Sequence, residues 1–170
     1  MAKKMADLNN HYGLKMRLFP SSQQKRVIDN NINASRFAYN EMVAIDKELY
    51  ALHQVKTPIA IVQDRIDYLQ RRKNNTQMLF AIHPWLAGTG VGTDVIDQAR
   101  RAYQNAWHLF RQVHHSGVPV FHRKRDDGSY QLPTRYAKSA MGLTGGSNRF
   151  LDKKHVVLSG LGKIRVAGSQ

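Results

Sequence analysis

Apolar and polar residues alternate near the start of the chain, from Tyr12 to Phe19. The apolar side chains fall on one face of this segment, and Lys15 and Arg17 fall on the other. A period of two residues is typical of a half-buried β-strand, and Pro20 ends the alternation. We therefore predict a short strand with one apolar face and one basic face.

Three longer segments carry apolar residues at spacings of three and four, which is the period of an amphipathic α-helix. They cover about 21–53, 57–73 and 93–116, and each begins with a serine or threonine that can cap a helix. Gly117 ends the third predicted helix. A His-Pro-Trp-Leu segment and three glycines, within 83–92, separate the second helix from the third.

The pattern typical of strands returns after Gly117. An Asp-Asp-Gly turn at 126–128 predicts a hairpin, and a small, polar, glycine-rich stretch at 138–149 predicts a loop. The strands predicted in this part of the chain are 118–122, 130–132, 155–158 and 161–166.

This order of strand, helices and strands predicts an α+β fold. The simplest packing returns the first strand to the later ones and closes a small sheet or β-barrel. Under this interpretation residues 1–20 and 118–170 form one domain. Residues 21–117 then form a helical domain that is inserted in it.

The chain of 170 residues carries 26 lysines and arginines against 12 aspartates and glutamates, which is a net charge of +14. The basic residues are spread over the whole chain and do not form a tail. With 42% hydrophobic residues the chain can build a core, which excludes a disordered basic segment. We rank nucleic acid as the partner above an anionic membrane surface, an acidic protein and simple solubility.

The absence of cysteine excludes a disulfide framework, cysteine-bound zinc and a cysteine nucleophile. No run of about 18 apolar residues is present. The N-terminal MAKKMADLNN has no apolar stretch after its lysines. We therefore expect a cytoplasmic protein without a membrane span or a secretory signal.

Six stretches of the sequence, in this order, resemble one known family. They are KMRLFPSSQQ (15–24), SRFAYNEM (35–42), HPWL (83–86), QARRAYQNAWHLF (98–110), GVPVFHRKR (117–125) and LGKIRV (161–166). Together they resemble the N-terminal half of the TnpB proteins of bacterial transposons, which are similar to the compact type V CRISPR effectors. The resemblance extends from about Tyr12 to Val166.

The resemblance implies that the first and later strands form a wedge domain, which is an oligonucleotide-binding-type β-barrel. It implies that the inserted helices form a recognition domain. The two domains of that family together hold a guide RNA and its heteroduplex with target double-stranded DNA. In such systems base pairing reads the target, and the protein reads the backbone and a short flanking motif.

The family continues after LGKI with a RuvC nuclease domain, and this chain shows none of the RuvC motifs. Cleavage by two metal ions needs clustered carboxylates. We therefore expect no enzymatic activity and no cofactor in this chain, with magnesium only where a partner nuclease is present. The expected partners are guide RNA, target DNA, and either a RuvC-like subunit or a second copy of the chain.

Candidate nucleic-acid contacts are side chains on the predicted polar faces and in the family-like stretches. They are Lys15, Arg17, Lys25, Arg26, Arg36, Tyr39, Asn40, Arg100, Arg101, Arg111, Phe121, Arg123, Lys124, Arg125, Tyr130, Lys163 and Arg165. Those near Phe121 are typical of a site where basic groups clamp a backbone and a ring stacks on a base. Core packing stays open for Tyr39, and a solvated face stays open for the helix arginines.

His114, His115 and His122 are the candidate metal ligands. Neighbouring residues of a helix point in different directions, however, and no third ligand stands at a spacing typical of a metal site. Asp126 and Asp127 are explained by their hairpin turn. We therefore predict neither a metal site nor a catalytic site.

Three hypotheses follow for the function. The leading one is a guide-RNA-binding and target-DNA-binding module without its own nuclease, as a subunit of a split effector or as a repressor. The second is a basic DNA-binding regulator that uses no guide. The third is a remnant or truncation of a transposon TnpB protein.

Overall fold

The computed structural model describes residues 13–56, 59–124, 128–135 and 146–167. The chain divides into two compact units. We call Met1–Ser21 with Arg135–Gln170 the sheet unit, and Ser22–Thr134 the helical unit. The two units are described separately below.

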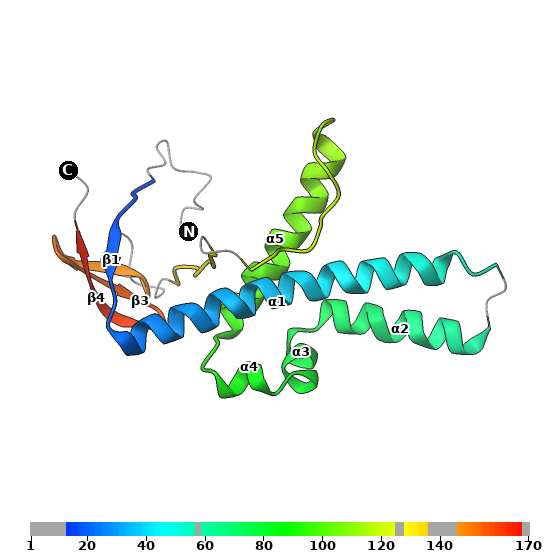
Figure 1. Cartoon of the computed structure of the whole chain (residues 1–170), viewed down its shortest axis with the longest axis horizontal. Helices are drawn as coiled ribbons and strands as arrows, with labels where there is room; N and C mark the ends of the chain where they lie inside the picture. Colours follow the sequence, from blue (N-terminus) through cyan, green and yellow to red (C-terminus); the bar gives the residue numbers. More distant parts are fainter. Residues whose placement is uncertain (1–12, 57–58, 125–127, 136–145, 168–170) are drawn as a thin grey trace, which may run out of the picture. The chain divides into compact units, whose positions relative to one another are not determined.

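The helical unit is built on one long helix. Its described helices are α1 (Ser22–His53), α2 (Ala60–Asn74), α3 (Thr76–Ile82), α4 (Trp85–Gly88) and α5 (Thr93–Gln112). The 32 residues of α1 make it about 48 Å long at 1.5 Å per residue. Within this unit α2 lies alongside α1, and α5 crosses it (Figure 1).

The structure confirms the three helices that periodicity predicts, as α1, α2 and α5. The expected start of the second helix, Thr57-Pro58, lies outside the described residues. Periodicity did not predict α3, because its seven residues are too few to show a period. The start of α3 still has a local signal, since the Asn75 side chain accepts a hydrogen bond from the Met78 amide at 3.1 Å.

Small residues let α1 approach its neighbours closely. Ala34 and Ala38 of α1 are fully buried, and they share one apolar cluster with Ala99 of α5. Leu79 of α3 and Leu86 of α4 complete this cluster from the other side. Close packing of this kind leaves little room for larger side chains along the contact.

A second cluster joins the middle of α1 to α2 and α5. The Tyr103 hydroxyl donates a hydrogen bond to Asp46, which also forms an ion pair with Lys73. Trp107 donates its indole N–H to the same hydroxyl at 2.6 Å. Burial, followed by the bond to Asp46, raises the pKa of Tyr103. The Asp46 carboxylate thus connects side chains from three helices, since it binds Tyr103 of α5 and Lys73 of α2.

The sheet unit contains four described strands. They are β1 (Arg17–Phe19), β2 (Arg149–Asp152), β3 (His155–Leu158) and β4 (Gly162–Ala167). All neighbours are antiparallel, in the order β1-β4-β3-β2, so the first strand does pair with the last one. Gly160 (φ 75°) and Gly162 (φ 71°) form the tight connection between β3 and β4, where a side chain would strain the backbone.

The structure confirms an α+β fold and the two C-terminal strands, but it corrects two strand predictions. Residues 118–122 and 130–132 form no strands and belong to the helical unit. Pro119 lacks a backbone donor, and side chains of α1 hold this segment in place of a neighbouring strand. Strand β2 was not predicted, and the described strands form an open sheet rather than a closed barrel.

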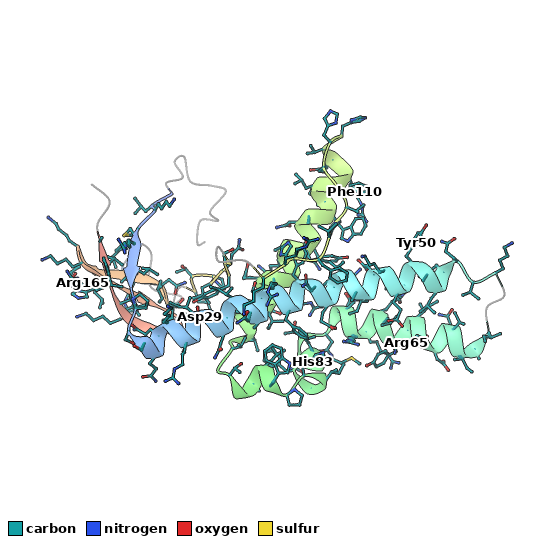
Figure 2. All side chains as sticks on the ribbon, viewed as in Figure 1. Asp29, Tyr50, Arg65, His83, Phe110 and Arg165 are labelled. Atoms are coloured by element: carbon teal, nitrogen blue, oxygen red, sulfur yellow. The ribbon has the colours of Figure 1, made fainter. Side chains whose placement is uncertain are left out.

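The Tyr103 hydroxyl should contribute measurably to stability. Tyr103→Phe leaves the Trp107 indole without its acceptor and removes a bond to Asp46. We expect the free energy of unfolding to fall by about 1–3 kcal/mol in urea denaturation. Tyr50→Phe is the matched control, because Tyr50 lies on α1 with 71% of its surface exposed (Figure 2). Equal stability of the two variants would contradict the role of the Tyr103 hydroxyl.

Candidate nucleic-acid interface

A groove of about 1250 Å³ lies in the helical unit, between α1, α5 and the segments Val120–Lys124 and Gly128–Gln131. Among the described residues, four basic side chains line it, against one acidic side chain, Asp29. The four are Arg36, Lys47, Arg123 and Lys124. A concave surface with this excess of positive charge attracts and concentrates polyanions.

The α1 side of the groove holds the backbone of the opposite wall directly. The Asn40 side chain donates a hydrogen bond to the His122 carbonyl at 3.0 Å and accepts one from the His122 amide at 2.8 Å. One side-chain amide therefore satisfies both backbone groups of a residue, as a neighbouring strand would. We call this contact the Asn40 clasp.

Aromatic contacts reinforce the clasp on each side. The His122 ring stacks on Tyr39, with centroids 3.8 Å apart and planes at 13°. Tyr39 is only 6% exposed, and it meets Tyr103 edge to face at 5.4 Å. Burial raises the pKa of Tyr39, and partial burial lowers the pKa of His122. The stack thus connects the groove wall to the core.

Phe121 is held by a cation–π contact. The Lys47 ammonium lies 4.5 Å from the centre of its ring, within the distance at which such pairs attract. The ring remains 45% exposed, so part of its surface is available to a ligand. Arg123 and Lys124 follow at once and are exposed. The clasp therefore places two basic side chains at the rim of the groove.

Tyr130 forms part of the wall farther along. It packs against the apolar cluster of Ala34 and Ala38 and hydrogen-bonds to Asn31. Burial raises the pKa of Tyr130 despite that bond. The Asn31 side-chain oxygen is itself buried without a partner among the described residues. Asn31 lies behind Tyr130 and is not one of the residues that line the groove.

The structure brings six of the predicted contact residues together at the groove. They are Arg36, Tyr39, Phe121, Arg123, Lys124 and Tyr130. Asn40 lies beside them but is engaged by the His122 backbone. The sequence left open whether Tyr39 packs in the core, and the structure shows that it does.

The other predicted residues lie elsewhere. Arg100 ties α5 to its neighbours through Thr76 and the Lys73 carbonyl, and burial lowers its pKa. Lys25 and Arg26 are exposed at the start of α1, and Arg101 and Arg111 are exposed on α5. Lys15, Arg17, Lys163 and Arg165 belong to the sheet unit, and Arg125 lies outside the described residues.

Sequence reasoning missed Lys47 as a member of the site. A signal was available, since Lys47 follows Asn40 by seven residues, which is two turns of a helix and returns to the same face. It also missed Asp29, for which no signal was available, because a single acid on a basic helix face has no distinguishing pattern. Neither residue stands in a recognisable motif.

The candidate metal ligands do not assemble. The rings of His114 and His115 meet edge to face at 4.8 Å. Within the part of the chain that the structure describes, no three histidine, aspartate or glutamate side chains gather as a metal would need. Within the same residues, no helix has the length and apolar character to cross a membrane.

Comparison with known families supports part of the resemblance. Residues 10–54 match the family model HTH_OrfB_IS605, which is described as a helix-turn-helix domain. The match links this part of the chain to the TnpB-type proteins of IS605 transposons. No curated protein matches the chain.

The matched residues do not fold as their description suggests. A helix-turn-helix has a turn of three or four residues between two helices. Here the match covers β1 and α1, and α1 is uninterrupted from Ser22 to His53. The next helix begins only at Ala60. The described part of the matched segment is therefore a strand followed by one long helix.

Loss of the clasp should loosen the groove wall. Asn40→Leu keeps a side chain of similar size but removes both bonds to His122. We expect faster amide hydrogen exchange across 118–124, with little change in α1, as measured by mass spectrometry. Asn105→Leu, at an exposed position of α5, is the control. Unchanged exchange at 118–124 in Asn40→Leu would show that the clasp does not hold the segment.

The stack on Tyr39 should make stability depend on pH. Burial lowers the pKa of His122 below its usual value of 6.5, so the fold favours the neutral ring. The neutral His122 ring stabilises the fold above pH 6.5, and this contribution to the free energy of unfolding is lost as pH falls through the lowered pKa. His122→Phe keeps a ring against Tyr39 without a charge. Its free energy of unfolding should fall less than that of the parent chain over this range, and parallel curves would refute the effect.

Proposed function

We propose that this chain is a nucleic-acid-binding module of a TnpB-type, RNA-guided DNA-recognition system, and that the groove of the helical unit is one of its binding surfaces. The observation that carries the proposal is the groove itself, where the described lining residues include Arg36, Lys47, Arg123 and Lys124 and one acid, Asp29. The net charge of +14 and the match of residues 10–54 support it.

The proposed ligands are a structured guide RNA and the target DNA that pairs with it. Under this proposal the helical unit acts as a recognition domain and the sheet unit as part of a wedge domain. Basic side chains would contact phosphates, which gives affinity without reading sequence. Base pairing between guide and target would supply the specificity.

We further propose that the module binds and does not cut. Hydrolysis by metal ions requires carboxylates that hold the ions, and among the charged residues described in the groove lining the cations outnumber the single carboxylate, Asp29. Cleavage would then come from a separate nuclease subunit that carries magnesium. Without such a subunit the same module would repress by occupying its target.

A DNA-binding regulator that uses no guide is the second candidate. The description of the matched family as a helix-turn-helix domain favours it, because such domains place a short helix in the major groove. The continuous α1 does not supply the turn that this docking needs within the matched residues. Direct reading of duplex DNA would have to use another element of the chain.

Removal of two rim charges tests the proposal. In Arg123→Gln/Lys124→Gln we expect weaker binding to structured guide RNA. The salt slope of log Kd should fall by about one for each phosphate that the variant no longer binds. Fluorescence anisotropy at several salt concentrations measures both quantities. Lys56→Gln/Arg71→Gln removes the same charge from exposed positions outside the groove.

The two double variants separate local contact from net charge. If both weaken binding equally, the groove is not the site and only the overall charge acts. If the parent chain binds a defined duplex tightly without RNA, and structured RNA weakly, the regulator hypothesis replaces the proposed one.

A further inference from the structure

The open sheet of the sheet unit has two unlike faces. Opposite residues of an antiparallel pair share a face, and Phe19 lies opposite Arg165. Leu18, Ile164 and Val166 point to the other face, where the last two are buried. The pairing through β3 places the following charged and aromatic residues with Phe19: Arg17, Arg149, Asp152, His155, Lys163 and Arg165.

This face, which we call the basic sheet face, carries an aromatic ring with two guanidinium groups close to it. The Arg17 guanidinium carbon lies 5.4 Å from the centre of the Phe19 ring, and that of Arg165 lies 5.6 Å from it. Phe19 is nevertheless 45% exposed. Figure 2 labels Arg165 on this sheet. The acid nearest to these groups by register, Asp152, is bonded to His155 at 2.9 Å.

A partly exposed ring on a basic sheet face suits a particular ligand. Bases of an unpaired strand stack on aromatic rings, whereas the bases of a duplex are already stacked on one another. Arginines beside the ring can bind the phosphates that flank the stacked base. A ring flanked by positive charge therefore fits an unpaired, negatively charged strand better than an apolar or cationic partner.

We propose that Phe19, with Arg17 and Arg165, forms a stacking site for one unpaired base of a single-stranded RNA segment. The inference rests on the proposed function, which supplies RNA as the ligand. It adds a second binding surface, in a different unit from the groove, and it names the ring on which a base stacks. The site discriminates unpaired from paired RNA rather than one sequence from another.

A purely structural role for the ring makes different predictions. Cross-strand pairs of a ring with a cation stabilise a sheet by themselves. Phe19→Leu would then lower the melting temperature and leave RNA affinity unchanged in the folded chain. If Phe19 instead stacks on a base, Phe19→Leu should lose RNA affinity even at temperatures where the variant is fully folded.

The test uses the full chain and a fluorescein-labelled single-stranded RNA of about 12 nucleotides, a length suited to one small β-domain. We expect Phe19→Leu to raise Kd about 5- to 100-fold, in line with the loss of one stacked base, without changing the salt slope. Arg165→Gln should lower the salt slope by about one. Phe19→Trp keeps a ring and should bind at least as tightly as the parent. Tyr50→Leu removes an exposed ring on α1 and should have no effect.

Each result of these binding measurements supports or overturns the stacking site. Equal Kd values for the parent and Phe19→Leu overturn the stacking site but leave the groove proposal standing. Equal weakening by Phe19→Trp and Phe19→Leu overturns it as well, because a ring would not be what matters. Single-stranded DNA of the same sequence is the second arm, and tighter binding of DNA than of RNA contradicts the choice of RNA. Failure of the parent chain to bind any RNA overturns the proposed function and this inference together.

Discussion

The contact between α1 and α5 determines the shape of the helical unit. Buried alanines bring the two helices close, and the Tyr103 hydroxyl then links α5 to Asp46 of α1. Because Asp46 also pairs with Lys73, the same carboxylate connects α2 to this contact. The residues that line the groove from α1 and α5 project from these two packed helices. Their relative positions are therefore set by the core and not by the flexibility of long basic side chains.

The chain from Val118 to Lys124 depends on that framework for its conformation. It has no strand partner among the described residues, and α1 holds it through Asn40, Tyr39 and Lys47. A segment held by side chains can present its own side chains and still lie on a rigid support, which suits a binding surface. The basic sheet face also presents its side chains on an ordered support, but there regular strand pairing places Phe19 beside Arg165. The chain thus offers basic and aromatic groups on two separate supports.

Periodicity predicted the long elements well, because burial of one face of α1 and α5 imposes a regular pattern over many turns. It failed at 118–122, where the apolar residues resemble those of a strand, but a side chain of α1 takes the place of a strand partner and Val118 and Val120 remain exposed. It also missed β2, which is four residues long and directly follows a glycine-rich stretch. For the site, sequence reasoning found the basic and aromatic residues around Phe121. It could not show that Asn40 is occupied by a backbone or that Arg100 is bonded within the unit, since both depend on contacts between distant segments.

The central claim is that the chain holds a structured RNA in its native setting. The most direct measurement is sequencing of the nucleic acid that purifies with the full chain from its host after ultraviolet cross-linking, with the cross-linked residues mapped by mass spectrometry. We expect one discrete, structured RNA species, with cross-links at Phe121–Lys124 and at Phe19. Recovery of duplex DNA alone, or of no discrete RNA, would contradict it.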